Sequence, residues 1–195
     1  MVALNDPGIV EALRDCGLLK YFMLFRMRQQ LELLQFLVHS WDPTDQPFHI
    51  GGKVLPILID DVYFLIVLLR HGAPISLSGF AHGGESVRDN IQRLCRPGTQ
   101  PSKDGKINIK DIRDLPLRTI LFTIAKLKSS LTLHLANISY MLFALECLEP
   151  TTFNWCEAVL SSMKEQLTKE KSGKMKNFSY GLILISFTLE RIPLM

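Results

Sequence analysis

The clearest pattern of hydrophobic and polar positions lies between residues 41 and 79. Two short apolar runs, residues 48–50 and 54–57, flank Gly51 and Gly52. Glycine supplies the positive φ angles that a tight connection needs, so we predict a β-hairpin here. Its second strand contains Pro56, which has no amide hydrogen to donate, and that strand is therefore expected at a sheet edge.

An uncharged apolar segment follows the acidic pair Asp60 and Asp61. Either carboxylate can accept hydrogen bonds from the free amides that begin a helix. The pattern predicts a helix that starts near Asp60, is buried nearly all round, and ends at Gly72 in the left-handed conformation. One face of this helix is formed by Val62, Leu65, Ile66 and Leu69.

Helical periodicity continues on both sides of this region. Asp6 and Pro7 are typical of a helix cap followed by proline in the first turn, and this short helix is expected to end near Gly17. Further helices are predicted within residues 18–41, 86–94, 115–127, 131–148, 152–169 and 178–191. The chain is therefore predicted to be mainly α: a single helical domain over residues 1–195 with a small β-hairpin near residues 48–57.

Composition limits the classes of protein that fit. The chain has 195 residues, of which 47% are hydrophobic, and this suits one domain with a sizeable core. Its four cysteines form no CxxC pair, and the amino terminus lacks the pattern of a signal peptide, which favours a reducing, intracellular and soluble setting. No uncharged apolar run reaches the roughly 18 residues of a membrane span, so no membrane association is expected.

The net charge of +3 permits contact with nucleic acid but does not require it. Residues 88–118 are the most basic part, and their acids are Asp89, Asp104, Asp111 and Asp114. Because these acids are interleaved, we interpret the segment as a solvated connection, with a phosphate-contacting surface as the alternative. The absence of aromatic residues here disfavours stacking on single strands. The candidate contact residues are Arg88, Arg93, Arg96, Lys103, Lys106, Lys110, Arg113 and Arg118.

Spacing argues against several catalytic sites. A phosphate-binding loop ending at Gly52 and Lys53 would need glycine at position 47 and a hydroxyl residue at position 54, where Pro47 and Val54 stand. The five histidines have no metal-ligand spacing, and no Gly-x-Ser-x-Gly elbow occurs. Asp60 and Asp61 could form an acid pair, but neighbouring helix positions point in different directions, which favours a capping role.

The central region contains a recognisable order of residues. These are Trp41, Phe48, His49, Gly52, Leu58, Asp61, Val62, Leu65, Leu69, Gly72, Pro74 and Gly79, with Gly17 and Leu18 before them. This order resembles the plant mobile domain, a family also described as "aminotransferase-like, plant mobile domain". One departure is Lys53, because the family usually has glutamate after the glycine that corresponds to Gly52.

The second half is also similar to this family. Trp155 begins a Trp-Gly-like element in which Cys156 replaces glycine, and Gly181 begins a leucine-rich stretch that closes with Arg191 and Pro193 in the family's Glu-Arg-x-Pro pattern. Family members continue well beyond this element, so the resemblance implies a shortened copy or a fragment. It also implies that Trp41, Phe48, Gly52, Asp61, Gly72, Trp155, Gly181, Arg191 and Pro193 maintain the fold.

The resemblance implies a non-enzymatic, transposon-related nuclear module of the maintenance-of-meristems-like type. Such proteins are tied to meristem maintenance, development and the silencing of repeats, here through unidentified protein partners. Pyridoxal phosphate chemistry needs a selected lysine, and Lys53, Lys126 and Lys128 have no pattern that selects one, so we expect no cofactor, metal or small-molecule substrate. The alternatives are nucleic-acid binding through residues 88–118 and a hydrolase or transferase activity inherited from a transposon.

Overall fold

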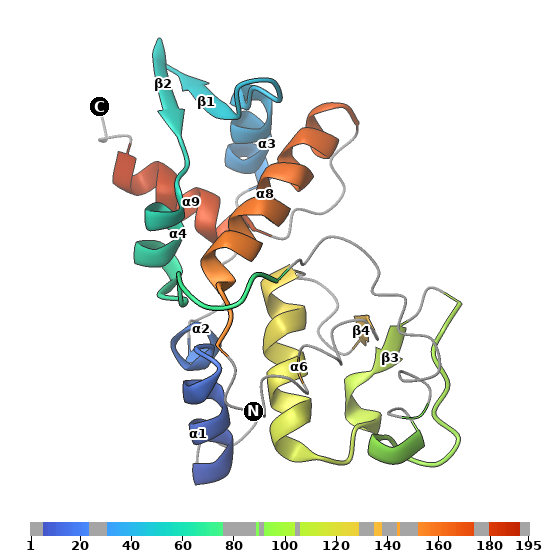
Figure 1. Ribbon diagram of the computed structural model, residues 1–195. Coiled ribbons are helices and arrows are strands. Elements are labelled where there is room, and N and C mark those ends of the chain that lie inside the picture. Colours follow the sequence, from blue (N-terminus) through green and yellow to red (C-terminus); the bar gives the residue numbers. More distant parts are fainter. Residues whose placement is uncertain are drawn as a thin grey trace.

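The structure is a computed structural model, and it is mainly α-helical with a small β-hairpin, which confirms the predicted fold class (Figure 1). No helix among the described residues is long and apolar enough to cross a membrane. The described residues are 6–23, 31–75, 89, 92–103, 106–128, 135–137, 144, 152–173 and 180–191.

The first helices agree with the amino-terminal pattern. Helix α1 (Pro7–Asp15) is capped by Asp6, whose Oδ1 accepts a hydrogen bond of 2.9 Å from the amide of Gly8. It ends before Gly17, which has a φ of 74°. The predicted helical segment 18–41 contains α2 (Leu19–Met23) and α3 (Leu31–Ser40), and residues 24–30 lie outside the described residues.

The predicted hairpin is confirmed. Strands β1 (Pro47–Ile50) and β2 (Lys53–Pro56) are antiparallel, with His49 opposite Val54. Because side chains alternate along a strand, Phe48 points into the core whereas His49 and Val54 are exposed. This sheet has two strands, so β2 is an edge strand, as Pro56 requires.

Helix α4 (Ile59–Ile66) begins where it was predicted but ends earlier. Val67 at its carboxyl end adopts the left-handed conformation with a φ of 52°, so the prediction of Gly72 as the helix stop is wrong. The prediction of burial nearly all round is also wrong, because Phe64 is 73% exposed. Helix α4 packs on two neighbours, α8 (Trp155–Lys171) and α9 (Gly181–Arg191), which leave one of its sides uncovered.

The middle of the chain contains a strand pair that the periodicity did not predict. Strand β3 (Lys106–Asn108) precedes the 3₁₀ turn η1 (Ile109–Asp111), and α6 (Leu115–Lys128) confirms the predicted helix 115–127. Strand β4 (Leu135–Asn137) pairs with β3 in antiparallel register, with Ile107 opposite Ala136. The prediction of a helix from residue 131 is therefore wrong at β4, because a distant strand supplies its hydrogen-bond partners.

The remaining predicted helices are seen in part. Helix α8 confirms the helix predicted within 152–169, and α9 lies within the predicted range 178–191. Residues 89 and 92–94 are helical, in agreement with the helix predicted at 86–94, whose other residues lie outside the described part.

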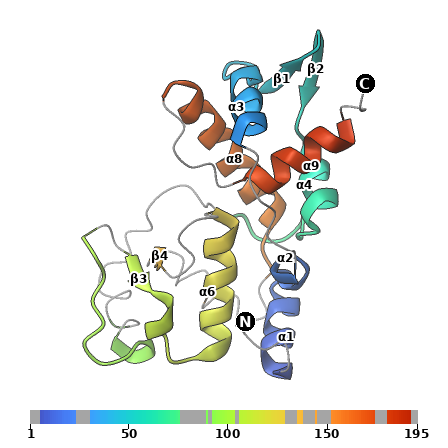
Figure 2. The ribbon, with the colours of Figure 1, turned by 180° about the vertical axis from the view of Figure 1, so that it is seen from behind.

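The elements form two groups, which are seen from opposite sides in Figures 1 and 2. One group contains α3, the hairpin, α4, α8 and α9, and the other contains α1, α2, α6, β3 and β4. The buried residues nevertheless form one hydrophobic cluster. The indole of Trp155, at the start of α8, donates a buried hydrogen bond of 2.7 Å to the carbonyl of Cys16 after α1, and thus links the two groups.

Candidate functional site

Three aromatic side chains from distant parts of the sequence pack together behind the hairpin. The ring centroids of Trp41 and Phe48 are 5.0 Å apart, and those of Phe48 and Phe187 are 5.8 Å apart. None of the three is more than 2% exposed. The structure thus brings together two residues of the predicted motif, Trp41 and Phe48, with Phe187 of α9.

An ion pair lies beside this aromatic cluster. The Asp61 carboxylate, which is buried, pairs with Arg191 and also accepts a hydrogen bond of 2.8 Å from the amide of Leu58. The Arg191 guanidinium lies 6.0 Å from the centroid of the Phe187 ring. Sequence reasoning selected Asp61 and Arg191 separately but had no signal that they pair, because 130 positions separate them.

The neighbouring acid has a different role. Asp60 is exposed and pairs with Arg70 at 2.6 Å, while the Arg70 guanidinium lies 5.0 Å from the centroid of the Tyr63 ring. Asp60 and Asp61 therefore have separate partners, and Asp61 has the capping role that the sequence favoured.

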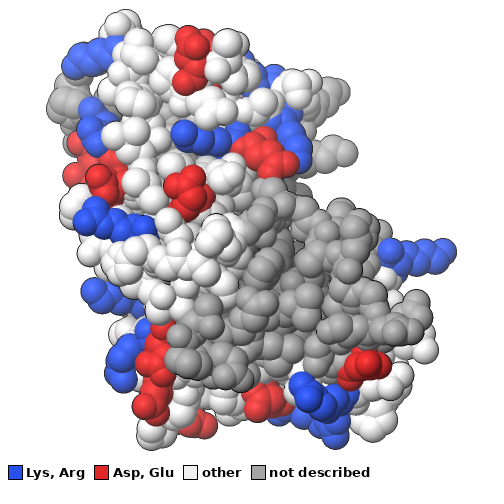
Figure 3. Space-filling view, viewed as in Figure 1, with Lys and Arg blue, Asp and Glu red and all other residues white. Residues whose placement is uncertain are grey.

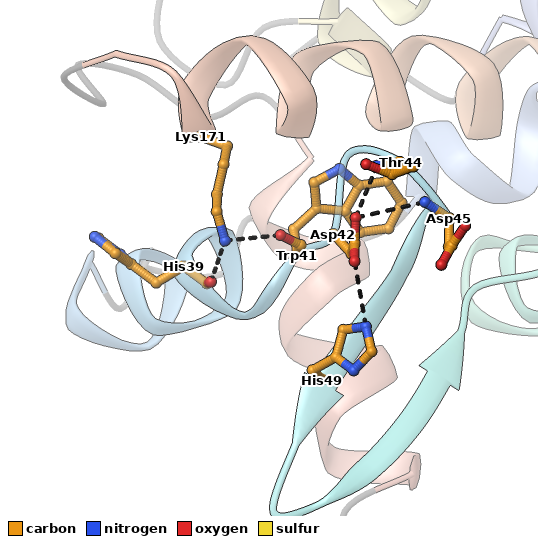
Figure 4. Close-up of polar contacts among 7 residues, drawn as sticks. All are labelled: His39, Trp41, Asp42, Thr44, Asp45, His49 and Lys171. Atoms are coloured by element: carbon orange, nitrogen blue, oxygen red, sulfur yellow. Dashed lines mark hydrogen bonds and ion pairs between the residues drawn. The ribbon is translucent and has the colours of Figure 1, made fainter.

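A lysine at the end of α8 forms hydrogen bonds with backbone carbonyls at the end of α3 (Figure 4). The Lys171 ammonium donates hydrogen bonds to the carbonyls of His39 and Trp41, the latter at 2.8 Å. The indole of Trp41 donates to the hydroxyl of Thr168 at 3.2 Å. Lys171 thus satisfies carbonyls at the end of a helix that have no partner within the helix.

An aspartate and a histidine approach each other beside this contact (Figure 4). Asp42 accepts hydrogen bonds from the amides of Thr44 at 2.8 Å and Asp45 at 3.4 Å, and its Oδ2 lies 3.6 Å from Nε2 of His49. The Thr44 amide, with smaller contributions from Asp45 and His49, lowers the pKa of Asp42. This geometry closes the turn that enters β1. No cluster of three or more metal-binding side chains occurs within the described residues.

Gly72 has a packing role in place of the predicted helix stop. Its φ is 127°, and a Cβ atom there would lie 2.5 Å from the carbonyl oxygen of Thr152. The backbone pairs next to it: Ala73 donates to Thr152 at 2.8 Å, and Asn154 donates to Ala73 at 3.0 Å. Gly72 therefore allows the backbone of residues 72–73 to pack directly against that of residues 152–154.

Cys156, which stands where the resembling family has glycine, is part of the same junction. Its thiol donates to the carbonyl of Leu68 at 3.1 Å, and burial raises its pKa to about 12. Burial also raises the pKa of Cys95, which lies in the other group of elements. A thiol that remains protonated is a poor nucleophile.

The other motif residues have structural positions or lie outside the described part. Gly52 has a φ of 75° in the hairpin turn, and Gly181 is buried at the start of α9. Pro193 and Arg88 lie outside the described residues.

A groove of about 510 Å³ lies between Gln46 and residues of α8. Gln46 adopts the left-handed conformation with a φ of 61°. The groove shares Thr168 with the indole contact of Trp41. Sequence reasoning missed it, because periodicity does not show that a turn will pack beside α8. Its lining residues are Gln46, Glu157, Leu160, Ser161, Lys164, Glu165, Thr168 and Lys169.

Backbone hydrogen bonds within the basic segment join residues 94–96 to residues 111–113. Cys95 and Ile112 are buried and form an antiparallel bridge. The amide of Arg96 donates to Asp111 at 2.8 Å, and that of Arg113 donates to Leu94 at 2.9 Å. Because side chains alternate, Arg96 and Arg113 project from the opposite, exposed face.

The other candidate cations of this segment are also at the surface. Arg118 is half-buried on α6, whereas the exposed cations are Arg93, Arg96, Lys103, Lys106, Lys110 and Arg113. Of the acids, Asp114 caps α6 by accepting a hydrogen bond of 2.7 Å from the amide of Leu117. Cations and acids alternate over the face in Figure 3, where neither sign forms a continuous area.

Comparison with known proteins gives a family but no function. No curated protein and no solved structure matches the chain. A family described as a domain of unknown function, DUF8566, matches residues 6–185. That description does not mention the plant mobile domain, so the resemblance stays a prediction. Since the match covers most of the sequence, the chain belongs to the DUF8566 family.

Proposed function

We propose that this protein is a non-catalytic module that acts through protein contacts. The supporting observation is that the hairpin and α4 carry buried hydrophobic side chains on one side and exposed ones on the other. The motif aromatics are buried, whereas Val54 on β2 is 59% exposed, Leu58 before α4 is 51% exposed and Phe64 on α4 is 73% exposed. We take these three exposed apolar side chains, which all lie within residues 54–64, as the surface that a partner covers.

The charged groups of the motif support the same proposal. Asp61 and Arg191 neutralise each other and tie the start of α4 to the end of α9. Lys171 and Asp42 are engaged by backbone groups. These contacts support a scaffold role for Asp61, Arg191, Lys171 and Asp42.

The resemblance to the plant mobile domain adds the cellular setting of the proposal. It implies a nuclear protein of the maintenance-of-meristems-like type, related to transposable elements and to the silencing of repeats. Trp41, Phe48, Asp61 and Arg191, which carry this resemblance, converge on one cluster, and the cellular setting rests on the resemblance.

The test compares two surface substitutions. Phe64→Ser removes the most exposed aromatic of α4, and Phe36→Ser removes a 50% exposed phenylalanine of α3. Tagged wild-type protein and both variants are expressed in plant cells, and bound proteins are quantified after crosslinking. We expect nuclear localisation of all three and a defined set of proteins lost only with Phe64→Ser. Identical sets for all three proteins, or no enrichment over the tag, would overturn the proposal.

A second candidate function is binding of nucleic acid through the basic segment. The favouring observation is that five of its exposed cations, all among the described residues, are not paired with an acid. Within the part of the chain that the structure describes, Arg96, Lys103, Lys106, Lys110 and Arg113 form no ion pair with an acid. Retained binding of duplex DNA at moderate salt would support this candidate, and no binding at low salt would exclude it.

A further inference from the structure

We infer that the basic segment is a phosphate-contacting surface for double-stranded nucleic acid, which it binds without reading base sequence. This inference rests on the second candidate function and names its ligand class. The surface, here called the 93–113 surface, consists of Arg93, Arg96, Lys103, Lys106, Lys110 and Arg113.

The charge distribution separates this surface from the rest of the chain. Residues 88–118 contain eight Lys and Arg against four Asp and Glu, an excess of four positive charges. The whole chain has 22 against 19, so all other residues together carry 14 against 15 and are slightly acidic. An anionic ligand is therefore attracted to this segment rather than to the chain as a whole.

Backbone pairing fixes the positions of Arg96 and Arg113 relative to each other. The bridge between Cys95 and Ile112 places Arg96 and Arg113 on one face, at diagonal positions roughly 7–8 Å apart. The Arg113 guanidinium is positioned by a hydrogen bond of 2.7 Å to the carbonyl of Arg93, which leaves further N–H groups for a ligand. Spacing of this order suits successive phosphates along a strand.

Lysines continue the surface beyond the bridge. The amide of Ser102 donates a hydrogen bond of 2.8 Å to the carbonyl of Lys106 at the start of β3, and Lys103 follows Ser102. Lys110 follows on η1. Figure 3 shows cations, with acids beside them, at the lower right of the molecule, over the part that contains β3 in Figure 1.

Within the described residues, no acid forms an ion pair with Arg96, Lys103, Lys106, Lys110 or Arg113. The Asp114 carboxylate caps α6 by accepting the amide of Leu117.

The residue types indicate the form of nucleic acid. Residues 88–118 contain no Phe, Tyr, Trp or His, so bases of a single strand have no aromatic side chain on which to stack. Flexible lysines contact phosphates as point charges and do not specify a base. The surface is therefore suited to the regular phosphate backbone of a duplex.

The experiment measures affinity against salt for the full chain. The probes are two duplex DNAs of unrelated sequence, one duplex RNA and one single-stranded DNA. For wild-type protein we expect similar affinities for the two DNA duplexes, weaker binding of the single strand, and a log–log salt slope of about −5 if all six cations contact phosphates. Preference for one DNA sequence or for the single strand would overturn the phosphate-backbone inference.

Matched charge variants locate the surface. Lys103→Gln/Lys106→Gln/Lys110→Gln removes three ammonium groups that form no hydrogen bond or ion pair with any residue described. The control, Lys20→Gln/Lys53→Gln/Lys164→Gln, removes the same charge from α2, β2 and α8. We expect the first variant to bind at least about tenfold more weakly, with a slope smaller by about three, and the control to bind like wild type.

The possible outcomes distinguish a failure of nucleic-acid binding itself from a failure of its assignment to the 93–113 surface. If wild-type protein binds duplex and both variants lose affinity equally, nucleic-acid binding stands and the 93–113 surface is wrong. If wild-type protein binds no probe at low salt, the second candidate function itself fails. Circular dichroism of both variants checks that each is folded.

Discussion

At the scale of single residues, adjacent side chains of one type have different energetic roles. Asp60 and Asp61 are neighbours in sequence, but their side chains lie in different surroundings: Asp60 is 57% exposed and Asp61 only 10% exposed. Removing a buried charge's partner is costly because the remaining group stays desolvated, whereas exposed pairs contribute little. The sequence alone could predict that one of them caps α4. It could not predict which one meets Arg191.

We expect Asp61→Ala to lower the free energy of unfolding by about 1 to 2 kcal/mol, because the Leu58 amide loses its acceptor and Arg191, which is 49% exposed, loses its partner. Asp60→Ala should cost under about 1 kcal/mol, as for other exposed ion pairs. Urea denaturation of both variants measures the difference. Equal losses would contradict the assigned role of the buried pair.

Asp42 provides a prediction of pH dependence. The Thr44 amide stabilises the ionised carboxylate, so the pKa of Asp42 is lower in the folded chain than in the unfolded chain. The associated stability is present above the unfolded pKa, near 4, and is lost as the pH falls through the folded pKa. Asp42→Asn lacks this contribution and should be less stable than wild type at about pH 7, with the difference shrinking towards about pH 2 to 3.

The comparison uses urea midpoints of the two proteins across this pH range, since other carboxylates titrate equally in both. His49→Gln is the matched control, because it removes the partner at 3.6 Å and keeps the Thr44 hydrogen bond. A difference between wild type and Asp42→Asn that stays constant with pH would show that the carboxylate charge contributes nothing.

At the scale of elements, hydrogen bonds between the ends of helices hold the hairpin group together. Helix α8 contacts α3 through Lys171 and Thr168, and the turn after α3 leads directly into β1. The helical pattern predicted α8 and the hairpin separately. Their contact was not predictable, because lysine at a helix end is common and nothing local specifies which carbonyls it meets.

Lys171→Met keeps the approximate length of the side chain and removes the hydrogen bonds to the carbonyls of His39 in α3 and of Trp41 just after it. We expect a loss of about 1 to 2 kcal/mol in unfolding free energy and faster amide hydrogen exchange in residues 41–46. Lys169→Met is the control, since it removes an exposed pair with Glu165 that should contribute about 0.5 kcal/mol. Unchanged exchange in residues 41–46 would show that the Lys171 hydrogen bonds do not stabilise this turn.

At the scale of the whole molecule, the two groups of elements meet where chain segments 68–73 and 152–156 run side by side. Trp155 bonds to Cys16, Cys156 bonds to Leu68, and Ala73 forms a parallel bridge with Phe153. Gly72 is the residue that permits this approach.

Gly72→Ala should therefore destabilise the protein by at least about 2 kcal/mol, because the new methyl group meets the Thr152 carbonyl and φ is positive. Gly51→Ala is the matched control: its φ of 56° is also positive, but open space surrounds the position, so a cost of about 1 kcal/mol is expected. Thermal unfolding of both variants tests this, and similar costs would rule out the close approach as the reason for glycine.

The sequence by itself determined the local structure: the capped α1, the Gly51–Gly52 hairpin, the start of α4, and the helices α6 and α8. These depend on caps, turns and periodicity, which act over a few residues. Only the tertiary structure decided where α4 ends, that residues 135–137 form a strand, and that Asp61 meets Arg191. Those outcomes depend on partners up to 130 positions away, and no local pattern encodes the identity of such a partner.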